Sequence, residues 1–420
     1  MWKRAVVVPV PKTTPACIDK LRPISLTDSF AKVFEGFVSK WLMQYIGSQL
    51  DNKQFGNIKG LSTTHCLVDL LHCLYQHAEK SKAVSTLVMT DFRKAFDRID
   101  HTIAIQKMIS FGVKPTLIRW IADFLTERTQ CVRYRGVTSE WVTMKAGVPQ
   151  GTKLGPIVFL IVINNALRDS NIAYWKYVDD VTVVDTRFAG DQSILLEATL
   201  QHFAEWSTSN GMSLNPAKCE SMQVCFMKKP PTPLSLEIDQ HPLKQSTSVK
   251  LLGVHIRCDL KWSDHVDFMI KRANGRIHLI RILKGHGLPI EDLCTIYTGF
   301  LRPLVEYASP VWNGGLTKEQ VNRLERVQKR TLKIILGPNY QSYETALNLM
   351  NLSSLADRRM ELCLSFAEKL ISNEKVSYLI PPCKNIRRLR KSNTREQLKC
   401  KTKRFRNSPI PYLIDLLNSQ

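Results

Sequence analysis

The stretch from Ile172 to Val184 reads IAYWKYVDDVTVV and places Asp179 and Asp180 between two short runs rich in β-branched and aromatic residues. Such runs predict a β-hairpin with the acidic pair near its tip. Neighbouring carboxylates repel each other, and Asn-Gly or Asp-Gly would build a purely structural turn more cheaply. The pair is better explained by a divalent cation, because Mg²⁺ prefers hard oxygen ligands. Solvated turns also contain such pairs, so the pair alone is a weak signal.

A second carboxylate lies upstream, where another apolar run ends. Residues 84–90 are typical of a buried strand, and Asp91 follows them directly. Strands that each deliver a carboxylate can hold a pair of Mg²⁺ ions, which clamps the attacking and leaving oxygens of a phosphoryl transfer. Asp91 and Asp179, assisted by Asp180, therefore fit nucleotidyl transfer. The alternative is that Asp91 caps the helix that follows it.

Several motifs in chain order resemble those of reverse transcriptases, most closely the non-LTR (LINE-type, Jockey/CR1-like) retrotransposon enzymes. DFRKAFD at 91–97, GVPQGTKLGP at 147–156 and YVDD at 177–180 resemble motifs A, B and C. The likeness also covers VPVPK at 8–12, LRPISL at 21–26 and QFG at 54–56. LNPAK at 214–218 resembles motif D, and KLLGV at 250–254 resembles the primer grip. So many motifs in one order make chance a poor explanation.

This resemblance implies a catalytic centre that binds metal ions. Asp91, Asp179 and Asp180 would be catalytic and, with Phe92, would hold two Mg²⁺ ions, for which Mn²⁺ could substitute. Lys218 would stabilise or protonate the leaving pyrophosphate. The function implied is that of an RNA-directed DNA polymerase, which extends a DNA 3′ end on an RNA template.

Four residues are expected to bind the incoming nucleotide: Lys12, Arg22, Phe96 and Gln150. Lys12 and Arg22 would donate charge-assisted hydrogen bonds to the triphosphate, although either could instead be a solvated surface cation. Phe96 stands where the DNA-polymerising members carry an aromatic residue that clashes with a 2′-OH, and a core role is compatible with this. Gln150 lies between two glycines, which let the backbone come close to a template base or nucleotide.

The resemblance and the order of elements predict an α/β right-hand polymerase fold. Fingers and palm, with a mixed antiparallel palm sheet, are expected over 1–257, including a primer grip at Leu252 and Gly253. A helical thumb-like region should follow at 258–340 and a further helical region at 341–383. Asp97 and His101, next to the first motif, are interpreted as structural residues.

Two further segments carry definite expectations. A helix is predicted over 25–46, with its apolar residues assigned to the core: Phe30, Val33, Phe34, Phe37, Trp41, Leu42 and Tyr45. Residues 384–420 are predicted to be a flexible, nucleic-acid-binding tail, because 384–406 contains eleven Lys or Arg and one acid.

Composition agrees with a polyanionic partner. The 420 residues carry a net charge of +22, which suits an RNA template and a DNA primer, although charge cannot separate DNA from RNA. Eleven cysteines without a C-x-x-C pair argue for a reducing compartment and against a zinc knuckle. No run approaches the ~18–20 apolar residues of a membrane span. We therefore expect a soluble intracellular protein, with nuclear localisation as a secondary alternative.

The sequence also departs from the family pattern. Val178 replaces the Ala that usually precedes the acidic pair, and Met1 falls close to the first fingers motif. The usual apurinic-type endonuclease is therefore expected to be absent, as in a 5′-truncated reading frame, so nicking would need a separate partner. Two function classes remain: a dNTP-using reverse transcriptase, or an inactive relic that binds nucleic acid without catalysis. An RNA-directed RNA polymerase is disfavoured by Phe96.

Overall fold

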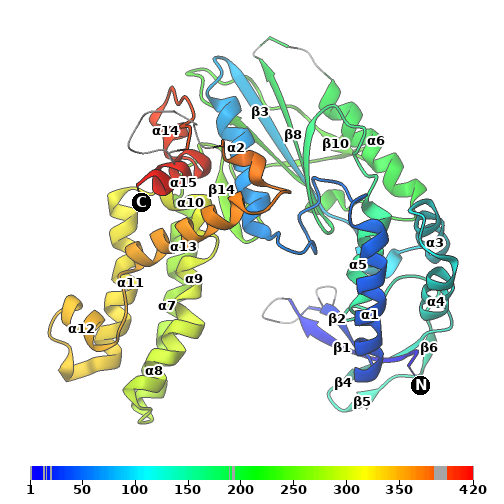
Figure 1. Ribbon diagram of the computed structural model, residues 1–420, viewed down its shortest axis with the longest axis horizontal. Helices are drawn as coiled ribbons and strands as arrows, with labels where there is room; N and C mark the ends of the chain where they lie inside the picture. Colours follow the sequence, from blue (N-terminus) through cyan, green and yellow to red (C-terminus); the bar gives the residue numbers. More distant parts are fainter. Residues whose placement is uncertain are drawn as a thin grey trace.

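The computed structural model describes residues 2–12, 15, 17–18, 21–188, 190–191, 194–382 and 395–419. Strands and helices alternate as far as β14 (Val254–Arg257), and every described element from Ser263 onward is helical. The chain forms an arch: one end carries α7 (Ser263–Gly285) and α11 (Lys318–Leu336), the other carries α1 (Ser29–Ile46) and β1 (Arg4–Pro11), and a sheet joins them (Figure 1). This is the expected α/β unit followed by a helical region.

The joining sheet has the strand order β12-β9-β3-β8-β7 and corresponds to the expected palm. Its strands are β3 (Ala83–Thr90), β7 (Ala173–Tyr177), β8 (Asp180–Phe188), β9 (Glu220–Cys225) and β12 (Lys244–Gln245). The central strand β3 pairs antiparallel with both β8 and β9, whereas β12 pairs parallel with β9. The mixed antiparallel palm sheet is therefore confirmed.

Alternate residues of the palm strands enter two different hydrophobic cores, because successive side chains of a strand point to opposite faces. Leu87 and Val88, neighbours on β3, are both fully buried and belong to separate cores. The core of Leu87 includes residues of α2 (Thr63–Ala78), and the core of Val88 includes residues of α5 (Leu154–Ile163). The sheet is thus covered on both faces, which leaves its strand ends for chemistry.

A second sheet lies in the part of the chain expected to be the fingers, in the order β2-β1-β4-β5, with β6 paired to β4. The strands are β1 (Arg4–Pro11), β2 (Leu21–Leu26), β4 (Thr129–Tyr134), β5 (Val137–Thr138) and β6 (Val142–Thr143). The other helices of the α/β part are α1 (Ser29–Ile46), α3 (His101–Ser110), α4 (Pro115–Leu125) and α6 (Leu195–Ser209). Short strands β10 (Glu237–Ile238), β11 (His241–Pro242) and β13 (Ser248–Leu251) complete the α/β part.

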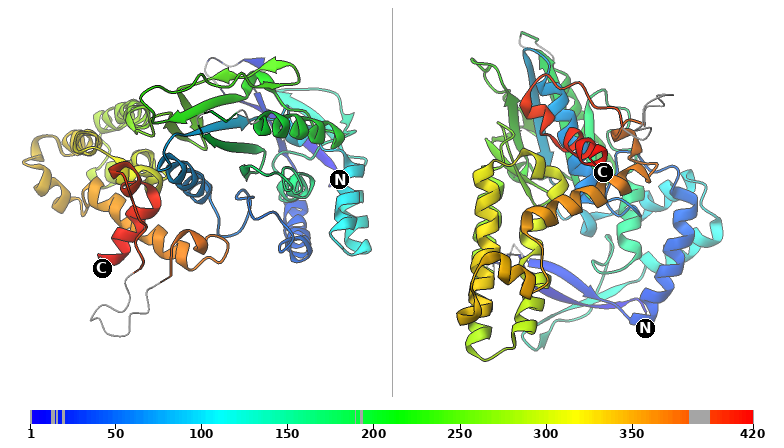
Figure 2. Two further views of the ribbon diagram at one scale, coloured as in Figure 1. Left: turned by 90° about the horizontal axis from the view of Figure 1, so that it is seen from above. Right: turned by 60° about the vertical axis from the view of Figure 1, so that its left-hand side comes forward.

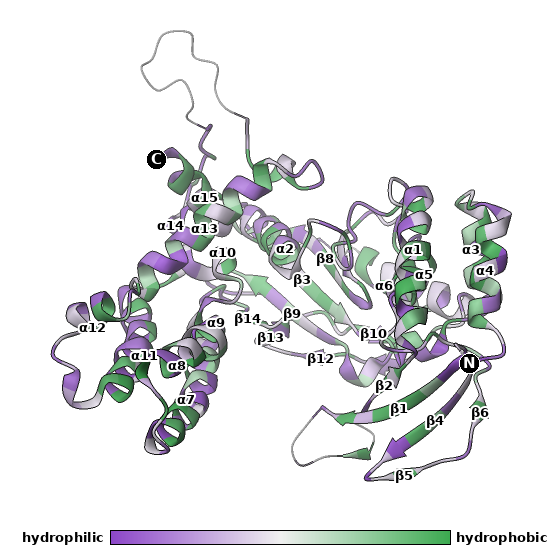
Figure 3. Ribbon diagram, turned by 60° about the horizontal axis from the view of Figure 1, so that its bottom comes forward, coloured by the Kyte–Doolittle hydropathy of each residue, from purple (hydrophilic) through white to green (hydrophobic). Residues whose placement is uncertain are grey.

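The prediction for helix α1 was wrong in its start and in its buried face. Residues 21–26 form β2, and Asp28 caps the helix by accepting a hydrogen bond from the N–H of Phe30 at 2.9 Å. Hydrophobic residues recur along α1 (Figure 3), but the buried ones differ from those assigned to the core. The buried stripe consists of Ala31, Glu35, Val38, Leu42 and Ile46. Of the assigned residues, Leu42 is buried and Tyr45 half-buried, whereas these are exposed: Phe30, Val33, Phe34, Phe37 and Trp41.

Glu35 explains this error. Its carboxylate accepts hydrogen bonds from the N–H groups of Lys153 (2.8 Å) and Leu154 (3.3 Å), and so satisfies donors at the start of α5. Burial raises the pKa of Glu35, while these hydrogen bonds oppose the rise. An acidic residue therefore occupies a core position, and counting apolar residues selects the opposite face.

The helical part comprises two groups of helices. The first contains α7 (Ser263–Gly285), α8 (Ile290–Ile296), α9 (Pro303–Glu306), α10 (Ser309–Trp312) and α11 (Lys318–Leu336). The second contains α12 (Tyr343–Leu349), α13 (Leu355–Ile371), α14 (Lys403–Arg406) and α15 (Pro409–Asn418). Among the helices that the structure describes, none combines the length and apolar character needed to cross a bilayer.

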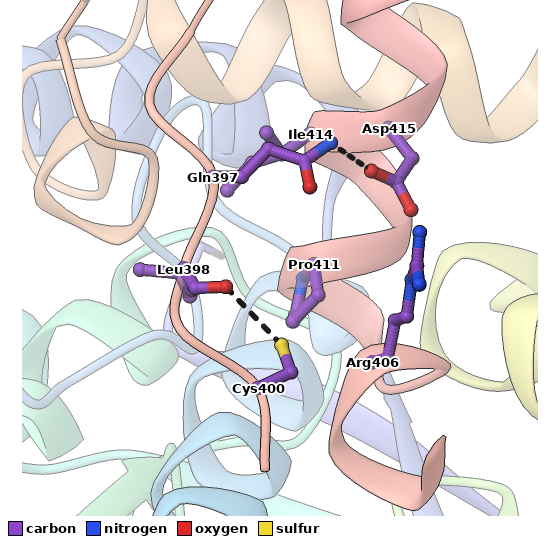
Figure 4. A pocket seen from close by; sticks show the side chains of 7 residues that line it. All are labelled: Gln397, Leu398, Cys400, Arg406, Pro411, Ile414 and Asp415. Atoms are coloured by element: carbon purple, nitrogen blue, oxygen red, sulfur yellow. Dashed lines mark hydrogen bonds between the residues drawn. The ribbon is translucent and has the colours of Figure 1, made fainter. Parts of the chain in front are cut away.

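The expectation of a flexible tail is wrong for residues 395–419, and residues 384–394 lie outside the described part. Helix α15 packs against α2 and α13 (Figure 2), and its Ile410, Leu413 and Ile414 are fully buried. Glu79, just after α2, accepts a hydrogen bond from the N–H of Thr402 at 3.1 Å. A cavity of about 200 Å³ is lined by residues 397–400 and by α15, and the side chain of Gln397 donates a hydrogen bond to Asp415 across it (Figure 4). The prediction was based on the high density of cations and did not take into account the apolar residues at helical spacing in α15.

Candidate active site

Three carboxylates lie at one end of the palm sheet. Asp91 directly follows β3, and Asp180 is the first residue of β8. Thr90 pairs with Val181 across these two strands, which brings the positions of Asp91 and Asp180 to neighbouring strand ends. Tyr177 pairs with Asp180, so Asp179 stands in the two-residue turn between β7 and β8. The acidic hairpin tip predicted from the sequence is therefore present beside Asp91.

The carboxylates share one electrostatic environment. The pKa of Asp180 is raised to about 6, chiefly by desolvation and in addition by the negative charges of Asp179 and Asp91. Desolvation also raises the pKa of Asp179; repulsion from Asp91 adds to this, whereas Arg22 and Lys12 oppose it. Both cations are exposed and come from the strands β1 and β2 or their connection. Both cations therefore act electrostatically on the acidic turn.

The carboxylates suit a hard divalent cation, although they do not form a ready-made cage. Within the described ranges, no three or more His, Cys, Asp or Glu side chains are grouped closely enough to hold a metal ion by themselves. Mg²⁺ commonly uses one or two protein carboxylates and completes its shell with water and substrate phosphates. Burial and repulsion from neighbouring carboxylates raise the pKa values of Asp179 and Asp180, and a bound cation would stabilise their charged forms. The chemistry of Asp91, Asp179 and Asp180 therefore fits a hard divalent cation whose remaining ligands come from water or substrate.

Lys218 lies beside the first carboxylate. Its Nζ is 3.1 Å from Oδ2 of Asp91, at the end of the short 3₁₀ helix Pro216–Lys218. The segment before it is fixed to the same strand end, because the N–H of Asn215 donates to the carbonyl oxygen of Asp91 at 2.7 Å. Phe92 and Leu214 form an isolated antiparallel bridge. The motif D-like segment therefore delivers a cation directly to the acidic site.

The two phenylalanines after Asp91 contact the same ring. Phe92 is buried, with its ring 6.5 Å from that of Phe159 and 5.8 Å from that of Phe203. Its side chain therefore belongs to the core, and only its main chain can serve a metal site. Phe96 is half-buried and stacks on Phe159 at 5.0 Å, within a short 3₁₀ helix, Ala95–Arg98. Phe96 is thus packed on one side while remaining partly accessible.

Gln150 is held by the residues that the sequence assigned a structural role. Its Nε2 donates to Oδ1 of Asp97 at 3.0 Å. His101 Nε2 lies 2.8 Å from the carbonyl oxygen of Gly147, at the start of the same turn. Gly147 has a φ of +82°, and a Cβ there would stand 2.6 Å from the carbonyl oxygen of Asp97. Asp97, His101 and this glycine therefore fix the turn that carries Gln150.

The expected primer grip is a tight turn between β13 and β14. Leu252 and Gly253 have φ values of +45° and +87°. The hydroxyl of Tyr307 donates to the carbonyl oxygen of Leu252 at 2.8 Å and lies 2.9 Å from Oγ1 of Thr63. Sequence reasoning missed Tyr307, because nothing in its own neighbourhood marks a contact with a turn 55 residues away.

A buried polar network behind the acidic turn was also missed. Lys176 is fully buried, and its Nζ is 2.5 Å from Oδ2 of Asp51. The same Nζ donates to the carbonyl oxygens of Asn164 and Ala166, each at 2.9 Å. The hydroxyl of Tyr174 donates to Asp51 Oδ2 at 2.9 Å. The sequence feature that could have indicated this network is Lys176 itself, a lysine within an otherwise apolar strand next to the acidic pair.

Comparison with known proteins agrees with this geometry. The family described as reverse transcriptase (RNA-dependent DNA polymerase) matches residues 10–256. A probable RNA-directed DNA polymerase from transposon X-element of Drosophila melanogaster is 27% identical over 83% of this chain and 39% of its own length. The RNA-directed DNA polymerase from mobile element jockey, from the same organism, is 24% identical over 88% of this chain and 42% of its own length. This chain therefore spans less than half of these relatives.

Among solved structures, telomerase from Candida tropicalis in complex with a telomeric RNA fragment has a TM-score of 0.46 and 12% identity. That alignment covers 99% of this chain and 61% of the telomerase chain. Such a TM-score is too low to support an argument about function.

Proposed function

Because this chain belongs to the reverse transcriptase family, we propose that it is an RNA-directed DNA polymerase of the non-LTR retrotransposon type. It would extend a DNA 3′ end along an RNA template, using dNTPs. The observation that carries this proposal is the meeting of Asp91, Asp179 and Asp180 at one end of the palm sheet, with Lys218 3.1 Å from Asp91.

The carboxylates would hold the metal ions of the reaction. Asp91, Asp179 and Asp180, with the main chain of Phe92, would hold two Mg²⁺ ions, which neutralise charge on the attacking and leaving oxygens. Lys218 is exposed and in reach of Asp91, so its ammonium group can turn toward a bound triphosphate. There it would stabilise the negative charge of the departing pyrophosphate and supply a proton.

The remaining residues would orient the substrates. Lys12 and Arg22 already act electrostatically on Asp179 and would bind the triphosphate from the fingers side. The partly accessible ring of Phe96 would exclude a 2′-OH, and Gln150 would contact the nucleotide or template base from its fixed turn. The turn at Leu252 and Gly253, supported by the thumb, would hold the primer strand.

The test is primer extension on an RNA template with Mg²⁺, comparing the natural chain with Asp179→Asn. The substitution removes one charge and changes little volume, so extension should be lost while template–primer affinity, measured by fluorescence anisotropy, is kept. Asp169→Asn is the matched control, because Asp169 is exposed in the turn after α5. Binding without any extension by the natural chain would favour the relic hypothesis. Equal loss of binding and extension in Asp179→Asn would indicate a structural role for that residue.

A further inference from the structure

A glutamine far from the acidic motif in sequence is bonded to its main chain. Gln54 lies in the loop between α1 and α2 and is 4% exposed. Its Oε1 accepts hydrogen bonds from the N–H of Val178 at 3.0 Å and from the N–H of Gly56 at 2.8 Å. Val178 is the first residue of the turn that presents Asp179. One buried side chain therefore fixes the backbone of the acidic turn.

The turn needs such a restraint, because Val178 adopts an unfavourable conformation. Its φ of +59° lies in the left-handed region, which a β-branched residue rarely enters. A residue stays in such a conformation only where the surrounding structure offsets the strain. Gly56 provides the space, since a Cβ at that position would lie 2.5 Å from both the nitrogen and Cγ2 of Val178.

The loop that carries Gln54 is itself anchored to the strand that leads into the turn. The N–H of Phe55 donates to the carbonyl oxygen of Lys176 at 2.8 Å, and the N–H of Lys176 donates to that of Lys53 at 2.9 Å. Asp51, at the start of the loop, forms the buried ion pair with Lys176. The loop thus continues the sheet beside β7, so Gln54 has a fixed position relative to the turn.

We propose that Gln54 is a positioning residue, whose side-chain oxygen holds Val178 in its left-handed conformation and thereby sets the placement of Asp179 and Asp180. It touches neither the carboxylates nor a substrate, so it acts through the main chain of the turn. The catalytic consequence rests on the proposed polymerase function, whereas the restraint on the turn does not. Loss of the oxygen should reduce kcat for nucleotide incorporation and leave template–primer affinity unchanged.

The direct test is amide hydrogen exchange at Val178 in Gln54→Met. Methionine has nearly the same length and no strong acceptor, so the Val178 N–H should exchange at least about tenfold faster if a bond worth roughly 1.4 kcal/mol is lost. Gln54→Glu keeps an acceptor oxygen and should preserve the protection. Gln49→Met is the matched control, because the exposed Gln49 side chain bonds Tyr45 and Phe111 and not the turn. Unchanged exchange at Val178 in Gln54→Met overturns the proposal.

Single-nucleotide incorporation gives the second readout. In Gln54→Met, kcat should fall about tenfold or more, while the template–primer Kd of the folded variant is unchanged. An unchanged kcat in an active enzyme overturns the catalytic part of the proposal. If the natural chain does not polymerise but Val178 exchange still accelerates, the restraint is supported and the proposed function fails. Should Gln54→Met not fold, Val178→Gly is added, because glycine adopts a positive φ without steric cost. Folding of the double variant supports the restraint, and failure to fold overturns it.

Discussion

Replacing Lys176 with Met tests the buried network behind the acidic turn. The Lys176 side chain is 0% exposed and its partner Asp51 only 6%, so the substitution leaves a buried carboxylate without its counter-charge. Breaking a buried ion pair from one side typically costs about 3–5 kcal/mol. The carbonyl oxygens of Asn164 and Ala166 also lose their shared donor. We therefore expect the free energy of unfolding to fall by about 3–5 kcal/mol, a large part of a domain's typical stability.

The assay is denaturant unfolding followed by tryptophan fluorescence, to which the neighbouring buried Trp175 contributes a local signal. Lys244→Met is the matched control: Lys244 pairs with Glu220 but is 69% exposed, so its loss should cost at most about 1 kcal/mol. Adding Asp51→Asn to Lys176→Met removes the stranded charge and should recover part of the loss. A Lys176→Met variant as stable as the Lys244→Met control would show that the buried Lys176–Asp51 pair does not stabilise the fold.

Three further predictions concern other regions. Burial lowers the pKa of His265 to about 3, whereas the pKa of a histidine in the unfolded chain is near 6.5. The unfolded chain therefore binds the proton more tightly than the folded chain. The contribution of His265 to the free energy of unfolding should be complete above pH 6.5 and lower by roughly 2 kcal/mol at pH 5. Denaturant unfolding at pH 7 and pH 5 measures this change, and His265→Gln should reduce the difference in stability between the two pH values. An unchanged difference in His265→Gln would mean that His265 is not its source. Deleting residues 395–420 should lower the melting temperature markedly, because α15 buries three large aliphatic side chains, each worth about 1.5–3 kcal/mol; an unchanged melting curve would mean that α15 is dispensable. Phe96→Ala should raise the ratio of rNTP to dNTP incorporation, and an unchanged ratio would leave Phe96 with only its packing on Phe159.

The acidic site could be predicted because its determinants are local. A strand followed by Asp91 and a hairpin that carries Asp179 and Asp180 can each be recognised within about ten residues of sequence from the pattern typical of strands. The alternation of elements also predicted the palm sheet and the helical region after it.

The rest could not be predicted because it depends on contacts between distant segments. The buried face of α1 is determined by Glu35, which accepts a hydrogen bond at the start of α5. Residues 395–419 have a defined structure because α15 packs against α2. The roles of Gln54 and Tyr307 arise from hydrogen bonds to main-chain atoms of remote turns. Every residue type offers a main-chain carbonyl, and all but proline offer a main-chain N–H. The residue type at the partner position therefore does not indicate such a hydrogen bond.

The proposed function requires that the carboxylates after β3 and between β7 and β8 bind divalent cations together. Cleavage by Fe²⁺ with ascorbate and peroxide tests it most directly, since hydroxyl radicals formed at a bound ion cut the nearest backbone, and mass spectrometry locates the cuts. We expect cuts near residue 91 and near residues 179–180 in the same molecules, suppressed by excess Mg²⁺ and lost in Asp179→Asn. Cuts at only one of these segments, or an unchanged pattern in Asp179→Asn, would contradict a shared metal site.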